Sequence, residues 1–500
     1  MNSHSCFLAV DSGTSKMKVA LIDEQNKFID LVTADLQVLH PFDGASEADM
    51  DKTWTTLCLL FNQLAQRNPA HWDQIIAIGV TGQGDGAWMV DRAGNPARNA
   101  ILWNDTRTKF TKIDQKASLD LYCQENSITP IFQGANYYIL KWVKENEPEV
   151  FNHIASVIHC KDWLNYKLTG TLATDFSDTS TAMLRSSSMS YDFKVLEFLG
   201  LQGSENLFAP IHYSDEIIGK VSNSAAVQTG LHPGIPVVIG SIDITAAAAG
   251  AGATEIGDTV AILGTTCCVT TVLQRNQLDY RDRRGSILCH QSRDRYLRLI
   301  AMSNGMASLD WVCETMLPDA SFEDIEEGIR GIEIGSEGVI FQPYLFGERA
   351  PFRDPNATGG FLGITARHTP YHLVHAAYEG LALALTQCYE ILPEPNDHIR
   401  IAGGGAANNV LCQMISDCFG KEIRRSKIAE LGLNGIVKAI RKGAGMAEVE
   451  STTLADEDLF CPDPIKHKRY MELLHLFQST LQAMEPWWEA RDNFLKLRKS

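Results

Sequence analysis

The stretch "VDSGTSKMKV", residues 10–19, decides how the first half of this chain folds. An apolar strand ends here in an acid, a glycine and two hydroxyl residues, and a second strand begins at a lysine. A tight β-turn explains this composition, because Asp, Ser and Gly suit turns. A phosphate-binding hairpin also explains it, with the backbone N–H groups of Gly13, Thr14 and Ser15 facing an anion. In that interpretation Asp11 organises a hydrated Mg²⁺.

A second stretch of the same kind lies half a chain away. "DTVAILGTTCCVTTVL", residues 258–273, again places Gly-Thr and a hydroxyl between two apolar runs. The Gly-Thr pairs lie at 13–14 and 264–265, an offset of 251 residues in a chain of 500. One such turn is common by chance, whereas two at this spacing favour a duplicated lobe with two facing phosphate hairpins.

The residues after the first hairpin alternate between helical and strand patterns. Apolar residues recur at helical spacing from Trp54 to Leu64, and an apolar strand at 75–80 then leads into "TGQGDG". This alternation predicts an α/β domain, whose ligands bind where strands end in loops. Pro and Gly in "LHPGIPVV", residues 231–238, mark the expected boundary between the lobes.

Composition excludes several classes of protein. A chain of 500 residues with 45% hydrophobic residues supports two globular domains. The net charge of −17 disfavours nucleic acid and anionic membranes as partners. Neither the first 11 residues nor the apolar stretch 236–253, which Asp243 interrupts, reads as a signal peptide or a membrane span. Twelve scattered cysteines without a CxxC pair are typical of reduced thiols, so we expect a cytoplasmic protein.

Taken together, the motifs resemble those of the FGGY carbohydrate kinases, which include glycerol, xylulose, ribulose, gluconate and erythritol kinases. The resemblance runs from Asp11 to about Gly445. The matching segments occur in one order: "DSGTSKMK" (11–18), "ILWNDTR" (101–107), "KDWLNYKLTG" (161–170), "GSIDITAAAAGAG" (240–252), "LGTT" (263–266), "PYLFGERAPFRDP" (343–355), "YEGLALAL" (378–385) and "IAGGGAANNVLCQMISD" (401–417).

The resemblance implies a two-lobed actin-like ATPase fold of the ribonuclease H-like α/β class, with an ATP cleft between duplicated domains. Residues 1–235 would form the N-terminal domain, with the substrate pocket and the first phosphate loop. Residues 236–450 would form the C-terminal domain, with the catalytic aspartate, the second phosphate loop and the adenosine site. Residues 451–500 would be a helical extension. The cofactors would be ATP and Mg²⁺.

The resemblance also assigns roles to individual residues. Asp243 follows the strand "IPVVIGSI" and precedes an alanine run, so it either caps that helix or acts as the general base, and the resemblance favours the base. Lys18 is either a phosphate ligand or an exposed strand lysine, and "AGGGAAN" is either a nucleotide loop or a tight turn. Nucleotide and phosphate binding is expected of Gly13, Thr14, Ser15, Lys18, Gly264, Thr265, Thr266, Gly404 and Asn408. Magnesium is expected at Asp11 and, through water, at Asp243.

The substrate pocket departs from the pattern of the xylulose kinases. Where those enzymes have Gly-Gln-Met-His-Gly, this chain has "GQGDG", so Gly84 replaces Met and Asp85 replaces His. An ionised Asp only accepts hydrogen bonds and therefore suits hydroxyls better than a ketose carbonyl, unless Asp85 is merely part of a turn or salt bridge. The other expected substrate ligands are Gln83, Trp103, Asn104, Asp105 and Asp243, although Trp103 would equally suit a core position.

The sequence therefore predicts an ATP-dependent kinase that phosphorylates a terminal hydroxyl of a small open-chain polyol or ketose, with an erythritol-like polyol favoured. A xylulose or L-xylulose kinase is the alternative. A non-catalytic sugar sensor on the same fold and an actin-like ATPase with a protein partner are alternatives from other classes. The partner is a small sugar or polyol, without nucleic acid or membrane, and the family allows a homodimer.

Overall fold

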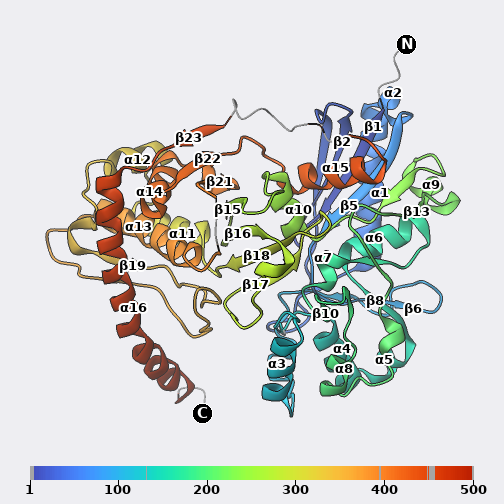
Figure 1. Cartoon of the computed structure of the whole chain (residues 1–500), viewed down its shortest axis with the longest axis horizontal. Helices are drawn as coiled ribbons and strands as arrows, with labels where there is room; N and C mark the ends of the chain where they lie inside the picture. The colour runs from blue at the N-terminus through green and yellow to red at the C-terminus, as the bar shows by residue number, and fades with distance from the viewer. Residues whose placement is uncertain (1–4, 131, 394–395, 448, 450–456, 498–500) are drawn as a thin grey trace. The chain divides into compact units, whose positions relative to one another are not determined.

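The chain folds into two units, each described here by itself (Figure 1). The computed structural model describes residues 5–130, 132–393, 396–447, 449 and 457–497. The first unit contains residues 1–250, 274–297 and 430–451, and the second contains 251–273, 298–429 and 452–500. The predicted domain limits 1–235, 236–450 and 451–500 remain a prediction, and residues 450–456 lie outside the described residues.

The first unit is built on a six-stranded sheet with the order β13-β14-β5-β1-β2-β3. Strand β1 (Cys6–Ser12) runs antiparallel to β2 (Lys16–Asp23) and parallel to β5 (Ile75–Gly82). The edge strands are β3 (Phe28–Asp35) and β13 (Ile217–Lys220), and β14 (Pro236–Val238) lies between β13 and β5. The predicted first hairpin is therefore β1–β2, and the loop between these strands contains Gly13, Thr14 and Ser15.

The second unit repeats this pattern in the strand order β18-β16-β15-β21-β22-β23. Strand β15 (Thr259–Leu263) is antiparallel to β16 (Cys267–Leu273) and parallel to β21 (His398–Ala402). Strand β22 (Glu422–Arg425) is parallel to β21 and antiparallel to β23 (Asp458–Phe460). In the first unit, β14 is likewise parallel to β5 and antiparallel to β13. The two Gly-Thr hairpins thus occupy equivalent strands of two sheets, as the 251-residue offset predicts.

Helices cover both faces of the first sheet. Helix α1 (Met50–Arg67) buries Trp54, Leu57 and Phe61 on one face, as its apolar spacing predicts. On the other face α15 (Leu431–Gly443) inserts apolar residues such as Ile436 against β1, β2 and β5. Helices α15 and α10 (Asp243–Gly250) pack backbone to backbone. A Cβ on Gly435 would lie only 1.9 Å from the carbonyl oxygen of Ala246, so glycine is needed there.

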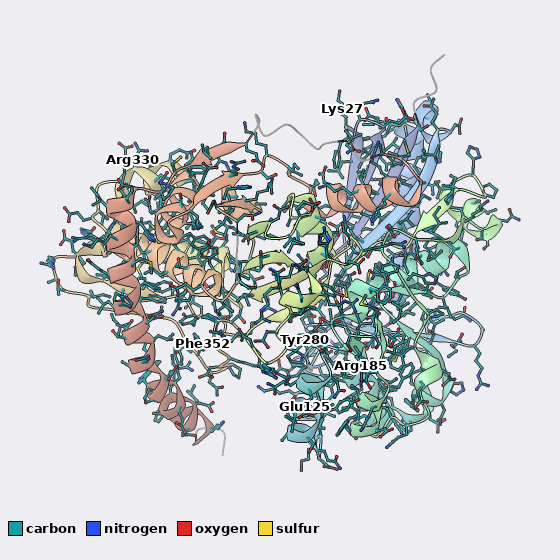
Figure 2. The ribbon with its side chains drawn as sticks, in the orientation of Figure 1. Lys27, Glu125, Arg185, Tyr280, Arg330 and Phe352 are labelled. Carbon is teal, nitrogen blue, oxygen red and sulfur yellow. The ribbon has the colours of Figure 1, made fainter. Side chains whose placement is uncertain are left out.

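The segment 274–297 also belongs to the first unit. The hydroxyl of Thr129 donates to the carbonyl of Ile287 at 3.0 Å, and the hydroxyls of Ser186 and Tyr280 share a hydrogen bond. Figure 2 labels Tyr280 together with Arg185, which pairs with Asp192.

The remaining helices of the first unit are α2 (Pro69–Trp72), α3 (Lys116–Glu125), α4 (Asn136–Asn146), α5 (Pro148–His153), α6 (Cys160–Thr169), α7 (Phe176–Thr179), α8 (Lys194–Phe198) and α9 (Asn223–Thr229). Its short strands are β4 (Glu47–Ala48), β6 (Trp88–Asp91), β7 (Ala100–Ile101), β8 (Ile154–Ile158), β9 (Thr174–Asp175), β10 (Leu184–Arg185), β11 (Ser190–Tyr191), β12 (Ile211–His212) and β17 (Ser286–Cys289).

The core of the second unit forms around helix α13 (Pro370–Tyr389), whose middle is buried on all sides. The other elements of this unit are β18 (Tyr296–Ala301), which begins in the first unit, α11 (Met306–Met316), α12 (Phe322–Ile329), β19 (Ile340–Gln342), β20 (Gly360–Leu362), α14 (Asn409–Phe419) and α16 (Pro464–Leu497). Helix α16 buries Tyr470, Leu474 and Phe477 in the same core. Among the described helices, none is long and apolar enough to cross a membrane.

Candidate functional site

The first Gly-Thr hairpin is a tight turn next to the start of α15. The N–H of Gly13 donates to the carbonyl of Lys16 at 3.0 Å, which closes the turn. Asp11 ends β1 beside α15, where a Cβ on Gly432 would lie 2.4 Å from Asp11 Oδ2. Lys18 pairs with Glu430 at 2.6 Å. The predicted phosphate role of Lys18 stays a prediction, and its ammonium already has a carboxylate partner.

Three predicted site residues from different parts of the sequence meet in one hydrogen-bonded chain. The indole N–H of Trp103 donates to Thr14 Oγ1 at 3.0 Å, and Thr14 Oγ1 donates to Gln83 Oε1 at 3.1 Å. Gln83 follows β5, and its N–H donates to the carbonyl of Ser12 at the end of β1. The sheet therefore places the predicted phosphate loop directly against the predicted substrate loop.

Asp85 lies on this substrate loop in an unusual conformation. Its φ is +51°, in the left-handed region that few residues other than glycine adopt, and Gly86 follows at +68°. Its Oδ1 is buried without a hydrogen-bond partner. Burial raises the pKa of Asp85 to about 6, although a hydrogen bond from Thr181 and the charge of His159 oppose the shift. Strain and an unsatisfied acceptor at one position are typical of ligand-binding residues.

Asp243 begins helix α10, and its Oδ1 accepts a hydrogen bond from the N–H of Ile244 at 2.6 Å. Burial and the charges of Asp11, Asp178 and Asp85 together raise the pKa of Asp243 to about 8, although the hydrogen bond from Ile244 opposes the shift. These four carboxylates are called the acidic cluster below. A carboxyl group whose pKa lies near neutrality suits general-base catalysis.

The sequence alone does not identify Asp178 or the two cationic side chains near it, Lys161 and His159. Asp178 is fully buried on α7, and its Oδ2 lies 3.0 Å from Nζ of Lys161. Lys161 also pairs with Asp162 at 2.6 Å and Asp175 at 3.0 Å. Burial alone lowers the pKa of His159, but Asp178 and Asp162 raise it to about 9. Lys161 belongs to the motif "KDWLNYKLTG", but its contact with Asp178 on α7 depends on the fold and is not indicated by the sequence.

His159, Asp162 and Asp178 are close enough together to suggest a metal site. The ammonium of Lys161, however, lies within 3.0 Å of both aspartates and supplies the positive charge. Lys161 therefore already supplies a cation to this buried group.

The two remaining substrate candidates differ in their surroundings. Asn104 is exposed at the surface of the first unit. Asp105 is buried, and its two oxygens accept hydrogen bonds from Arg107 and from the N–H of Ser46. A direct contact of Asp105 with substrate stays a prediction, while its present partners fix the loop that carries Trp103.

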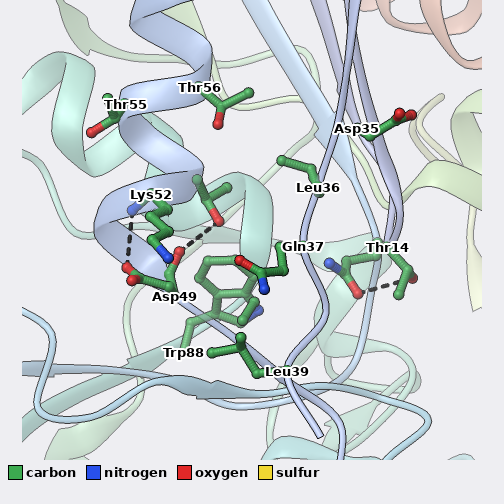
Figure 3. A pocket seen from close by; sticks show the side chains of 13 residues that line it. Thr14, Asp35, Leu36, Gln37, Leu39, Asp49, Lys52, Thr55, Thr56 and Trp88 are labelled. Atoms are coloured by element: carbon green, nitrogen blue, oxygen red, sulfur yellow. Dashed lines mark hydrogen bonds between the residues drawn. The ribbon is translucent and has the colours of Figure 1, made fainter.

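A pocket of about 230 Å³ adjoins the Thr14–Gln83 pair (Figure 3). Its wall is formed by the chain that follows β3, by the first turns of α1 and by Trp88. The figure shows Thr14 at its rim, hydrogen-bonded to Gln83, with Asp49 and Lys52 on the helical side. Most of its polar lining residues are hydroxyls or amides, which suit an uncharged polar ligand.

In the second unit, the loop between β15 and β16 is the counterpart of the first hairpin. The N–H of Gly264 donates to the carbonyl of Thr266 at 3.2 Å, and Thr265 and Thr266 are exposed. Gly305 lies against this loop, since a Cβ there would be 2.6 Å from the N–H nitrogen of Cys267. Buried Glu348 accepts from the N–H of Ser303 and from Asn304, which fixes the approach to the loop.

The predicted adenosine loop follows β21 in the same unit. Gly403, rather than Gly404, is the glycine that the backbone requires there, because its φ is +94° and a Cβ would lie 2.5 Å from the carbonyl of Leu263. Gly404 faces open space. Asn408 caps α14 by accepting from the N–H of Leu411, and its amide donates to Tyr378. Nucleotide contacts at Gly404 and Asn408 remain predictions.

The acidic cluster suits a divalent cation. Asp11 and Asp243 are carboxylate ligands whose pKa values are raised chiefly by burial, and the charge of Asp11 opposes ionisation of Asp243. Hard cations such as Mg²⁺ prefer carboxylate oxygens and water, and a bound cation would relieve this repulsion.

Duplicated sheets, each with a Gly-Thr hairpin, and a base-like aspartate beside one hairpin define a phosphotransferase of the two-domain actin-like ATPase fold. The family models agree. The N-terminal domain model of the FGGY family of carbohydrate kinases matches residues 6–250, and the C-terminal domain model matches residues 259–440. The chain belongs to the FGGY family of carbohydrate kinases, which are phosphotransferases with a sugar hydroxyl as acceptor.

Individual relatives are similar over nearly their whole length. A probable L-xylulose kinase from Haemophilus influenzae is 27% identical, covering 96% of this chain and 99% of the relative. An erythritol kinase from Brucella abortus is also 27% identical, with 96% and 97% covered. The crystal structure of a ligand-bound xylulose kinase from Lactobacillus acidophilus superposes with a TM-score of 0.88 at 22% identity, covering 96% of this chain and 98% of that chain. That likeness concerns the fold.

Proposed function

We propose that this carbohydrate kinase transfers the γ-phosphoryl group of ATP to a terminal hydroxyl of a small open-chain polyol, with an erythritol-like tetritol favoured. The observation that carries the proposal is Asp85, whose buried Oδ1 lacks a partner and whose pKa is about 6. At pH 7 roughly nine-tenths of such groups are ionised, and an ionised carboxylate accepts hydrogen bonds but donates none. A hydroxyl satisfies Oδ1, whereas a carbonyl would place two acceptors opposite each other.

In this proposal three members of the acidic cluster, Asp243, Asp85 and Asp11, have a task. The ionised form of Asp243, a minor fraction at pH 7 because its pKa is about 8, accepts the proton of the attacking hydroxyl, and Asp85 holds a second hydroxyl of the substrate. Asp11 and, through water, Asp243 would hold Mg²⁺, which neutralises charge on the phosphates. Thr14, held between Trp103 and Gln83, keeps the first hairpin in place for the phosphates.

The second hairpin would bind the same triphosphate. Thr14 and Ser15 would offer backbone donors from the first unit, and Thr265 and Thr266 would offer theirs from the second, while the N–H groups of Gly13 and Gly264 close the two turns. Gly404 and Asn408 would lie beside the adenosine. The short turns at both hairpins support this assignment, because Thr14, Ser15, Thr265 and Thr266 lie between the paired strands and not within them.

A pentulose kinase is the second candidate. It is favoured by relatives named xylulose kinase and probable L-xylulose kinase, which are 28% and 27% identical to this chain. Gln83 and Trp103 would serve a pentulose as well as a polyol, so the distinction depends on Asp85.

The test is a coupled assay of ADP production with erythritol, xylitol, glycerol, D-xylulose and L-xylulose, on wild type and on Asp243→Asn. We expect the highest kcat/KM with erythritol and a loss of about 10²–10⁴-fold in Asp243→Asn, the range typical of general-base catalysis. A clear preference for a ketulose would contradict the polyol assignment. Undiminished turnover in Asp243→Asn would remove Asp243 from the role of base.

A further inference from the structure

Gly84 and Ile242 are 158 residues apart in sequence and in direct contact in the first unit. A Cβ built on Gly84 would lie 1.8 Å from Cδ1 of Ile242 and 2.4 Å from its Cγ1. Both distances are far below any tolerated contact, so Ile242 occupies the space in which a side chain at position 84 would lie. Gly84 directly precedes Asp85, and Ile242 directly precedes Asp243.

Ile242 cannot easily move away from this contact. Its N–H donates to Ser177 Oγ at 2.9 Å, and its backbone forms a parallel bridge with Gly82. Its side chain is only 5% exposed. Oδ1 of Asp178 lies 3.2 Å from the same Cβ position on Gly84, which closes another side. The contact therefore joins the chain that carries Asp85 to the chain that carries Asp243.

We propose that the Gly84–Ile242 contact determines which chain length of substrate the kinase accepts. Ile242 acts as a positioning residue, because it fixes the distance between the carboxylates of Asp85 and Asp243. Asp85 holds one hydroxyl of the substrate, and Asp243 takes the proton of the attacking hydroxyl. This inference rests on the function proposed above and adds the source of its specificity.

The length of the substrate's carbon chain is the quantity that this contact discriminates. An open-chain substrate must place its terminal hydroxyl at Asp243 while another hydroxyl reaches Asp85. Each added carbon lengthens an extended chain by about 1.2 Å, judged from the span of three bonds in an extended peptide. A misplacement of about 1 Å costs on the order of 100-fold in rate. A fixed separation therefore discriminates between substrates that differ by one carbon.

The contact also predicts how substitutions should behave together. Ile242→Ala removes the group that fills the space over Gly84 and loosens the separation. Gly84→Ala keeps Ile242 but forces it or the substrate loop to shift. In the double variant the alanine methyl at 84 takes up space that the shortened residue 242 has left, so the two changes should compensate each other.

The experiment measures kcat/KM for erythritol and xylitol, a pair that differs by one carbon, in wild type, both single variants and the double variant. Gly331→Ala is the matched control, because a Cβ there meets nothing within 4 Å and the residue lies in the second unit. Thermal unfolding is recorded for every protein. If Gly84→Ala does not fold, Ile242→Val and Ile242→Ala form a graded series that tests the same point.

We expect Ile242→Ala to reduce the preference between the two polyols at least fivefold, with Ile242→Val in between. Gly84→Ala should lower kcat/KM at least tenfold on both polyols, and the double variant should recover to within about threefold of Ile242→Ala. An unchanged preference in folded Ile242→Ala, or no recovery in the double variant, would overturn the inference. If the wild type phosphorylates neither polyol but does phosphorylate ketuloses, the result contradicts the proposed polyol substrate and not the role of the Gly84–Ile242 contact.

Discussion

The substitution Asp243→Asn should slow phosphoryl transfer by about 10²–10⁴-fold and at the same time stabilise the folded protein. The carboxyl group of Asp243 lies close to Asp11, Asp85 and Asp178, and burial together with their charges raises its pKa from 3.8 to about 8. Such a group opposes folding when it ionises. An asparagine keeps nearly the same shape and the hydrogen bond from Ile244 but carries no charge.

The direction in which the free energy of unfolding changes with pH follows from proton linkage. Between pH 4 and pH 8 the folded state holds a proton on Asp243 that the unfolded state has lost, so the free energy of unfolding falls as the pH rises through this window. The two pKa values differ by about four units, which sets a ceiling of roughly 6 kcal/mol at ~1.4 kcal/mol per unit. Asp243 keeps some contact with solvent, so we expect a gain of about 1–3 kcal/mol at pH 8.

The assay is calorimetric unfolding of wild type and Asp243→Asn at several pH values from 5 to 8. The Tm of the variant should exceed that of wild type by an amount that grows with pH. Asp162→Asn is the matched control, and its effect on Tm should be in the opposite direction. Burial raises the pKa of Asp162, but Lys161 and His159 lower it more, so its removal should decrease Tm.

A Tm difference that stays constant from pH 5 to pH 8, or a variant less stable than wild type at pH 8, would refute the reasoning. Either result would mean that the charge of Asp243 is already compensated in the folded protein.

Three further predictions test other parts of the site. As the pH falls from 8 to 5, Asp85 gains a proton near pH 6 and can then donate a hydrogen bond to a carbonyl. The ratio of kcat/KM for L-xylulose to kcat/KM for erythritol should therefore rise. In Asp85→Asn this ratio should not vary with pH. Lys161→Met leaves three buried aspartates short of a cation and should destabilise the first unit by about 3–5 kcal/mol, measured by chemical denaturation. Gly432→Ala places a methyl group 2.4 Å from Asp11, so Asp11 must shift; the Mg²⁺ concentration that gives half-maximal activity should rise at least tenfold, and Tm should fall.

The duplicated architecture could be predicted from the sequence because it depends on local signals. Each Gly-Thr turn lies between two apolar runs, and the structure confirms that both are hairpins at equivalent strands of two sheets. Helix α16 lies within the C-terminal stretch for which the sequence predicts a helical extension. The strand expected in "IPVVIGSI" is shorter, since Gly240 has a φ of +75° and approaches the carbonyl of Val80.

The candidate site could be predicted only as a set of residue types. The sequence predicts Thr14 for phosphate binding and Gln83 and Trp103 for substrate binding, whereas the hydrogen bonds that join all three depend on the fold. The pairing of Asp105 with Arg107 and the neighbouring Ser46 N–H depends on loops that only the fold brings together. The contact between Gly84 and Ile242 joins residues 158 positions apart, and no periodicity in the sequence indicates it.

Helix α15 imposes an order of assembly on this protein during its synthesis. One face of the first sheet is closed by a helix that lies near residue 440, after almost the entire second unit. At 5–20 residues per second, the roughly 190 residues between α10 and the end of α15 take about 10–40 s to be made. During that interval we expect the nascent first unit to present an uncovered apolar surface, which makes it a client for a ribosome-associated chaperone until its last helix emerges.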